Sequence, residues 1–152
     1  SLSCHYIGLI ALTPFKGIIP KISEQTKATR KMLNCMLDNM HYEKINEVTY
    51  SANDYINEID NKIYSITNVE DNLDKAYIEV NKLKEEFKRN FLCYNLDEYD
   101  KSYKKILLIE GCFIKNKEKI DNIKKNLNST KKTNKEILTR VKKLNSQKKT
   151  LQ

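Results

Sequence analysis

The side chains with the most reactive chemistry in this 152-residue chain are four cysteines: Cys4, Cys35, Cys93 and Cys112. No two of them form a Cys-x-x-Cys motif, and the two histidines are not spaced from them as zinc ligands usually are. An even number of cysteines in a small chain is typical of a secreted protein with disulfides. We therefore predict two disulfides, a secreted protein and no structural metal. The alternative is four buried free thiols.

The expected helices narrow the possible disulfide pairings. A turn near residues 95–97 would join two antiparallel helices and separate Cys93 from Cys112 by roughly 20 Å along the helix axis, at ~1.5 Å per residue. A disulfide needs a Cα–Cα distance below about 7 Å, so this pair is disfavoured. Two pairings remain open. We prefer Cys4–Cys93 with Cys35–Cys112, and the other is Cys4–Cys112 with Cys35–Cys93.

Side chains that commonly perform catalysis are sparse in the sequence. His41 follows Cys35 by six residues, which would place the two on different faces of a helix, unlike a nucleophile and its base. The sequence contains no Glu-x-x-His motif of the kind that binds metals in di-metal helical bundles. It also lacks the clustered glycines of a phosphate-binding loop. We expect a non-enzymatic protein with no cofactor, no metal and no small-molecule substrate.

The scarcity of turn-forming residues predicts long helices. The chain has three glycines and two prolines, and all of them except Gly111 lie within the first twenty residues. A fold that crosses often between short elements needs such residues at each crossing. We therefore predict an all-α fold, namely an antiparallel up-down four-helix bundle that forms a single domain over residues 1–152.

The first twenty residues are the most apolar part of the chain. We expect a short helix that ends before Pro14, followed by a loop through Gly17 and Pro20. The segment is too short to span a membrane, so we interpret it as a strap over one end of the bundle. The alternative is a segment that inserts into a membrane or contacts a partner. Its candidate contact residues are Tyr6, Ile7, Leu9, Ile10, Phe15, Ile18 and Ile19.

Beyond the strap, only polar residues mark the ends of the helices. Ser23 is expected to cap the first long helix. Thr67 and Thr133 each begin a capping-box pattern, with a glutamate three residues later, and we predict a break at both. An unbroken helix from Ile45 to Phe91 is the alternative to the break at Thr67. The predicted helical segments are 22–66, 67–94, 97–128 and 133–151.

Some positions on the apolar faces of these segments are polar: Lys62, Lys117, Thr130 and Asn134. Polar residues at such positions lower stability and specify which helices pair. We therefore expect a bundle with a narrow, partly polar core that can rearrange with modest input.

Positive charge is concentrated in the last third of the chain. Residues 101–152 contain sixteen basic and four acidic side chains. One interpretation is packing against acidic helices, and the other is binding to a membrane surface. The candidate contacts for such a surface are Lys142, Lys143, Lys148 and Lys149. This region has one arginine and few aromatic residues, so we expect no nucleic-acid partner.

Two stretches, ISEQTKATRKMLNCMLDNMH and EEFKRNFLCYNLDEYD, each place a cysteine in a long polar segment without proline. With its abundant lysine, asparagine and isoleucine, the chain resembles secreted helical proteins of malaria parasites, among them the sporozoite microneme proteins of cell traversal. The resemblance extends over the whole chain as overall character, without a diagnostic motif.

The resemblance implies a protein held in a secretory organelle such as the microneme and then released. It would assist host-cell traversal or entry by acting at host membranes, so its partners would be host membrane lipids or a host or parasite surface protein. The alternative function is a protein–protein interaction module, either an invasion ligand that binds a host receptor or a coiled-coil scaffold.

Overall fold

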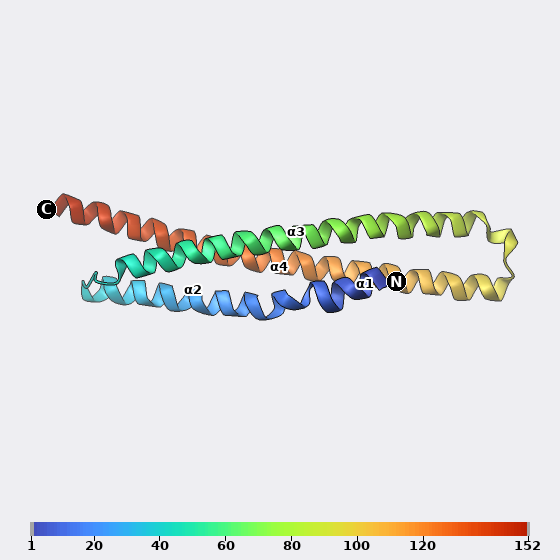
Figure 1. The fold of residues 1–152 in the computed structure, drawn as a ribbon, viewed down its shortest axis with the longest axis horizontal. Helices are drawn as coiled ribbons and strands as arrows, with labels where there is room; N and C mark the ends of the chain where they lie inside the picture. The colour runs from blue at the N-terminus through green and yellow to red at the C-terminus, as the bar shows by residue number, and fades with distance from the viewer. Residues whose placement is uncertain (1, 152) are drawn as a thin grey trace. The chain divides into compact units, whose positions relative to one another are not determined.

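The computed structural model describes residues 2–151, and the side chains of residues 4–147. Three long helices make up most of it (Figure 1), and the described residues contain no strand. The all-α prediction is confirmed, but four helices is wrong because the long helices number three. In chain order the elements are α1 (Leu2–Tyr6), the π-helical turn η1 (Ile7–Ala11), α2 (Thr13–Asn39), α3 (Ile45–Arg89), the 3-10 turn η2 (Phe91–Cys93) and α4 (Leu96–Leu151).

The two longest helices bury a residue at every seventh position, which is the spacing of a coiled coil. This stripe continues without a change of phase past Thr67 in α3 and past Thr133 in α4, so the predicted breaks at both residues are wrong. A helix cap contributes only about 1 kcal/mol. Ending either helix there would take several apolar residues out of the core. The buried positions are Ile45, Ala52, Ile59, Ile66 and Leu73 in α3, and Phe113, Ile120, Leu127, Asn134 and Val141 in α4.

The predicted loop ahead of Ser23 is also wrong, because α2 is already helical there and Ser23 lies inside it. Pro14 occupies the first turn, where its missing N–H has no helical partner to lose. Pro20 lies within the helix and costs about 3 kcal/mol. Burial of Phe15 and Ile22 on one face offsets that cost, at ~1.5–3 kcal/mol for a fully buried side chain of this size.

A tight turn over residues 40–44 separates α2 from α3, so the predicted segment 22–66 is two helices rather than one. Met40 adopts the left-handed backbone conformation, with φ of 56°. The N–H of His41 donates to the carbonyl of Met36 at 3.1 Å, as in the Schellman motif that closes many helices. The turn therefore forms without glycine.

The chain divides into two compact units, and the expectation of a single domain stays a prediction. The first unit comprises Ser1–Pro14 and Ser65–Asn122, and the second comprises Phe15–Tyr64 and Ile123–Gln152. In the second unit, parts of α2, α3 and α4 enclose a hydrophobic core. Its fully or nearly fully buried side chains include Leu33, Met36, Val48, Ala52, Ile137 and Val141, with Ile22, Ile59 and Leu127 in a neighbouring cluster.

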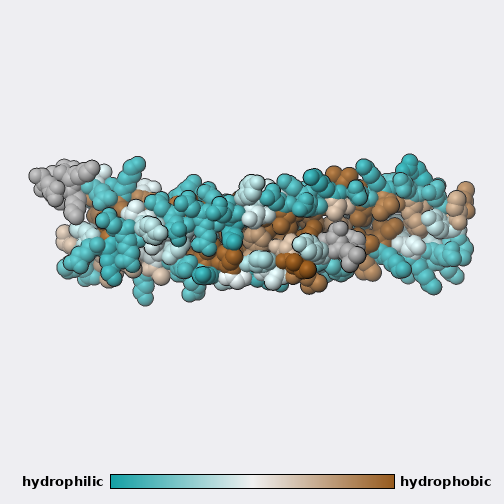
Figure 2. Space-filling model, viewed as in Figure 1, coloured by the Kyte–Doolittle hydropathy of each residue, from teal (hydrophilic) through white to brown (hydrophobic). Residues whose placement is uncertain are grey.

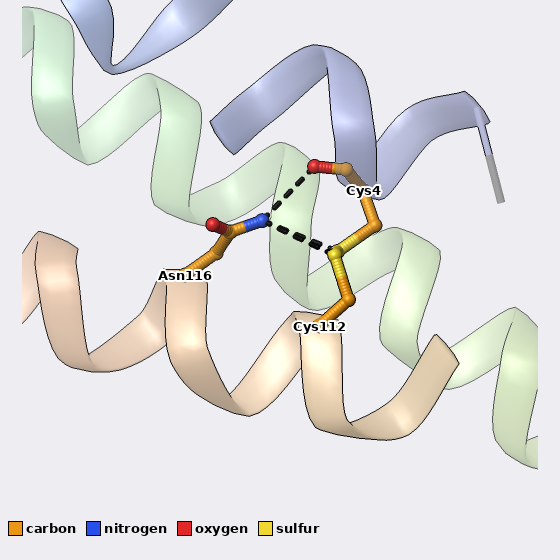
Figure 3. Close-up of a disulfide and its surroundings, with 3 residues drawn as sticks. All are labelled: Cys4, Cys112 and Asn116. Atoms are coloured by element: carbon orange, nitrogen blue, oxygen red, sulfur yellow. Dashed lines mark hydrogen bonds between the residues drawn. A yellow bond between two sulfur atoms is a disulfide. The ribbon is translucent and has the colours of Figure 1, made fainter. Parts of the chain in front are cut away.

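In the first unit, a disulfide between Cys4 and Cys112 fastens α1 to α4, with a Cα–Cα distance of 6.3 Å (Figure 3). Asn116 lies one turn further along α4 and is buried. Its Nδ2 donates to the carbonyl oxygen of Cys4 at 2.9 Å and also lies 3.2 Å from the sulfur of Cys4. A Cβ added at Gly8 would lie 2.9 Å from the Asn116 Oδ1 atom. Glycine therefore lets η1 approach α4 closely.

This disulfide corrects the predicted pairing. Cys4 bonds to Cys112, so the preferred combination of Cys4–Cys93 with Cys35–Cys112 is wrong. Cys35 and Cys93 are exposed free thiols, so the described residues contain one disulfide rather than two. The N-terminal segment packs beside the part of α4 that holds Cys112, whereas Cys93 lies in η2 beyond the start of that helix.

Candidate functional site

In the first unit, α3 and α4 run side by side as a hairpin that ends in an exposed apolar tip. We define the hairpin tip as residues 91–96. Its four large apolar side chains are all exposed, and Leu92 is exposed to 93%. Apolar residues that gather at one exposed place usually mark an interaction site, whereas scattered ones do not. The members of this cluster are Phe91, Leu92, Tyr94 and Leu96.

A group of packed aromatic rings supports the tip. Phe87 of α3 stacks on Tyr99 of α4, with ring centroids 4.7 Å apart and an interplanar angle of 13°. Tyr94 packs against Phe87 at 4.7 Å, and Phe91 meets Tyr99 edge-on at 4.9 Å. Each such pair contributes about 0.5–1.5 kcal/mol beyond the area that it buries. Residues 74–112 contain no buried side chain, so this part of the hairpin has no hydrophobic core. The packed rings hold the tip in place instead.

Helix-end chemistry places the tip at this point of the chain. The side-chain oxygen of Asn95 accepts a hydrogen bond from the N–H of Glu98 at 2.9 Å, which caps the start of α4. Asp97 and Glu98 lie in the first turn of α4, and Lys88 and Arg89 lie in the last turn of α3. These signs complement the partial charges of the helix ends.

Ion pairs join the two helices along one flank of the hairpin. Lys84 Nζ lies 2.7 Å from Glu110 Oε1. Lys117 Nζ lies 3.0 Å from Glu70 Oε2 and 3.5 Å from Asp74 Oδ1. Hydrogen bonding to Glu110 raises the pKa of Lys84 above its ordinary value, and hydrogen bonding to Glu70 does the same for the pKa of Lys117. These charges hold α3 and α4 in register, as flanking pairs do in coiled coils.

An open groove of about 320 Å³ lies between α3 and α4 on this flank. The Tyr77 and Phe113 rings meet edge-on within it, at 5.7 Å. Figure 2 shows brown apolar surface gathered over the hairpin. The groove is an apolar recess with a charged rim, and it is lined by Leu73, Asp74, Tyr77, Phe113, Ile114, Lys117 and Glu118.

The charge around the tip differs in sign from the charge of the C-terminal region. Residues 85–100 contain five acidic and two basic side chains, whereas residues 123–147 contain one acidic and eight basic ones. The exposed apolar cluster therefore lies in an acidic setting, and the basic segment belongs to the second unit.

The predicted contact residues of the N-terminal segment divide between surface and core. Tyr6, Leu9 and Ile10 are exposed in the first unit, whereas Ile7 is buried. Their positions on opposite faces of one helical segment account for this difference.

In the second unit, Phe15 is buried, and Ile18 and Ile19 are half-buried. The two isoleucines pack against the cluster of Ile22, Ile59 and Leu127. These three predicted contact residues are therefore part of the packing of α2.

Of the four predicted lysine contacts, Lys142 and Lys143 are exposed on α4. Lys148 and Lys149 lie outside the residues whose side chains are described. The structure therefore leaves the first two available to a partner.

The polar positions of the core have different partners. Asn134 is fully buried, and its Nδ2 donates to the Thr26 hydroxyl at 2.9 Å and to the Thr130 carbonyl at 3.0 Å. Its Oδ1 has no partner among the described residues. Lys62 is half-buried, and Lys117 forms the ion pairs described above. The core of the second unit is therefore polar at the level of Asn134.

Sequence reasoning missed the hairpin tip as a site. It placed Phe91 within the predicted helical segment 67–94 and used residues 95–97 only to mark a turn. A usable signal was present, because FLCYNL places four large apolar residues directly beside that turn.

Among the described residues, no group of three His, Cys, Asp or Glu side chains is arranged to hold a metal ion. None of the helices in that part of the chain combines the length and hydrophobicity that crossing a membrane requires. Compared with known proteins, the chain matches no family model, no curated protein and no solved structure. The candidate site therefore rests on the geometry of the hairpin tip.

Proposed function

We propose that this chain is a non-enzymatic, secreted helical module that binds a protein on the host-cell surface through its hairpin tip and thereby assists cell entry. The observation that carries the proposal is the cluster of four exposed apolar side chains on packed aromatic rings. The resemblance to secreted parasite proteins, with their micronemal storage, supplies the host-cell setting. The Cys4–Cys112 disulfide supports passage through an oxidising compartment.

The charge around the tip favours a protein partner over lipid. Five acidic side chains within residues 85–100 would be repelled by an anionic membrane surface. The same charges would attract a protein whose apolar pocket has a basic rim. Tyrosine and other aromatic residues are also enriched among the side chains that dominate protein–protein binding energy.

Membrane binding is the second candidate function, and two observations support it. Tyr6, Leu9 and Ile10 expose apolar surface on the N-terminal segment, and Lys142 and Lys143 expose positive charge on α4. The polar core level at Asn134 would lower the cost of opening the second unit to expose more apolar surface. This mode predicts binding to anionic vesicles that weakens as salt is added.

A binding experiment with two surfaces separates the candidates. The labelled chain is added to hepatocytes and to erythrocytes, each with and without trypsin pretreatment, and separately to protein-free phosphatidylserine vesicles. The tip variant is F91S/L92S/L96S. The matched control is Y50S/Y64S, which changes two exposed tyrosines of α3 in the second unit.

We expect saturable binding to at least one cell type, lost on trypsin treatment and lost in the tip variant but kept in the control. Circular dichroism should show the same helix content for all three chains. Vesicle binding by the wild type, unchanged in the tip variant and reduced by salt, would instead support the membrane mode. Cell binding that survives in the tip variant would refute the proposed site.

A further inference from the structure

The disulfide of the first unit holds a segment that has few other contacts to keep it in place. We define the docked segment as residues 2–12, which form α1, η1 and the residue that follows. Among its described side chains, only Cys4, Ile7 and Leu12 are buried. A helix this short is barely stable by itself in water, and π-helical turns are rare in proteins. The covalent bond to Cys112 is therefore a main reason why the segment stays on α4.

The two sulfur atoms of this disulfide have different surroundings (Figure 3). Cys4 is fully buried, whereas Cys112 is half-buried, so a reductant gains access from the Cys112 side. The Asn116 Nδ2 atom lies 3.2 Å from Cys4 Sγ and 3.8 Å from Cys112 Sγ. An N–H group that donates to a thiolate stabilises it, and disulfide exchange is faster when the departing thiolate is more stable. Asn116 therefore favours Cys4 as the sulfur that departs.

The charges on this side of α4 favour an incoming anion. Lys105 and Lys119 lie seven residues before and after Cys112, which places them on the same side of the helix, and both are exposed. Glu110 and Glu118 lie on the other flank, where Glu110 is paired with α3 and Glu118 lines the groove. The attacking form of a thiol is its thiolate, and positive charge raises the local concentration of an anion.

From these observations we propose that the Cys4–Cys112 disulfide is a redox-operated latch, which a thiol reductant opens to free the docked segment from α4. A reductant thiolate attacks Cys112 Sγ and forms a mixed disulfide with it. The bond between the two cysteine sulfurs breaks, and its electron pair stays on Cys4 Sγ, which then takes a proton from water. A second reductant thiolate attacks the reductant sulfur of the mixed disulfide. Cys112 is released as a thiolate and protonated, and the reductant is oxidised to its own disulfide.

Opening the latch changes the surface that the chain presents. In the closed form Tyr6, Leu9 and Ile10 are exposed, whereas Ile7 and Leu12 are buried. Freeing the segment exposes all five side chains on a short arm that contains no Asp, Glu, Lys or Arg. The latch stays closed in an oxidising compartment and opens where a thiol reductant is present. It uses no residue of the hairpin tip, so it is independent of the proposed binding site.

Two measurements on the full chain test the latch, with glutathione and dithiothreitol as reductants. All chains carry C35S/C93S, so that the exposed free thiols take no part in exchange. In the first, the chain reacts briefly with glutathione, N-ethylmaleimide stops the reaction, and mass spectrometry locates both labels. In the second, hydrogen exchange of residues 2–12 is compared between the disulfide form, the dithiothreitol-reduced chain and C4S/C112S.

A charge variant tests whether the thiolate enters at Cys112. K105E/K119E reverses the two lysines beside that residue. The matched control is K142E/K143E, which reverses two exposed lysines of α4 in the second unit.

We expect the singly modified chain to carry glutathione on Cys112 and maleimide on Cys4. Residues 2–12 should lose their protection from exchange in both the reduced chain and C4S/C112S, whereas α3 and α4 keep theirs. At low ionic strength, K105E/K119E should react with glutathione roughly fivefold more slowly than the control, because the anion meets negative charge instead of positive.

Several results would overturn the proposal. One is glutathione found mainly on Cys4, and another is a docked segment that stays protected in C4S/C112S. Loss of protection throughout α3 and α4 would also overturn it, because the disulfide would then hold the whole chain together rather than one segment. Equal rates for K105E/K119E and its control would contradict entry at Cys112 and overturn the proposed step.

Discussion

At the scale of single residues, close contacts in the first unit depend on the absence of a side chain. Gly8 lies against the buried amide of Asn116, and that amide in turn holds the carbonyl of Cys4. The disulfide to Cys112 fixes the same segment. The disulfide, the buried Asn116 amide and Gly8 therefore together hold α1 and η1 against α4.

The same substitution at two glycines should have opposite effects. We expect Gly8→Ala to lower the free energy of unfolding by about 1–3 kcal/mol, because the new methyl group displaces the Asn116 side chain and costs it hydrogen bonds. Gly17→Ala should raise it by up to about 1 kcal/mol, because α2 offers open space there and alanine favours helix.

Urea unfolding of both variants, read by circular dichroism with the disulfide intact, measures this pair. Two destabilised variants would show that both glycines are needed for the backbone itself. Two stabilised variants would show that η1 does not approach Asn116 as closely as described.

Residue-level detail could be predicted from the sequence only in part. Cysteine count and helix geometry left Cys4–Cys112 among the open pairings but did not select it, because the position of the N-terminal segment along α4 depends on tertiary packing. Gly8 and Asn116 are 108 positions apart in the sequence, so no local sequence pattern could predict that they lie close together.

At the scale of elements, repeated burial at every seventh residue decides where helices continue and where they end. Capping-box patterns at Thr67 and Thr133 did not interrupt α3 or α4, because each side chain lies beside a buried, mostly apolar stripe that stays in phase. The turn at Met40 forms where such a stripe ends. The spacing of apolar residues predicted the extent of the helices better than the polar capping residues did. Helix content was therefore easier to predict than the number of helices.

The polar level in the second unit should limit its stability. We expect T26V/N134L to raise the free energy of unfolding by roughly 1–2 kcal/mol, because it replaces a buried polar pair by apolar groups of similar shape, and the Asn134 oxygen of that pair has no hydrogen-bond partner among the described residues. Asn134→Ala alone should lower it, because it leaves a cavity and deprives the Thr26 hydroxyl of its donor.

Chemical denaturation of these two variants beside the wild type provides the comparison. A double variant less stable than the wild type would mean that the buried Asn134 amide contributes more to the free energy of unfolding than the apolar side chains that replace the pair. Such a result would remove the argument that this core is ready to rearrange.

The ion pair of Lys84 with Glu110 should stabilise the hairpin in a pH-dependent way. Because hydrogen bonding to Glu110 raises the pKa of Lys84 in the folded chain, the contribution is complete below the ordinary value of about 10.5. It is lost as pH rises through the higher folded value. We expect Lys84→Met to lower Tm at about pH 8, and the difference from the wild type to be smaller at about pH 12, because the Lys84 ammonium loses its proton as pH rises.

The readout is the difference in Tm between wild type and variant at each pH, since tyrosine ionisation affects both chains. Lys82→Met, at another lysine of α3, serves as the control and should show a small difference at both pH values. A Lys84→Met difference that is equal at both pH values would indicate lost packing rather than a lost ion pair.

At the scale of the whole molecule, charge and exposed apolar surface are distributed unevenly along the chain. The basic excess was interpreted either as packing against acidic helices or as binding to a membrane surface, whereas the four exposed apolar side chains of the hairpin tip lie in an acidic setting. The basic excess can be read from the composition. The exposure of the apolar cluster could be recognised only from the structure, in which residues 91–96 form the end of a hairpin without a buried core. The functional proposal rests on this second feature.

Cys93 offers the most direct measurement of the central claim, because it is an exposed free thiol within the hairpin tip. A polarity-sensitive fluorophore is attached to Cys93 in a C35S chain, and to Cys35 in a C93S chain as the matched control. Both chains are titrated with the cell type that binds the wild type. We predict a saturable blue shift for the Cys93 label alone, abolished when the cells are pretreated with trypsin. A shift confined to the Cys35 label, or the same Cys93 shift with protein-free vesicles, would contradict protein binding through the tip.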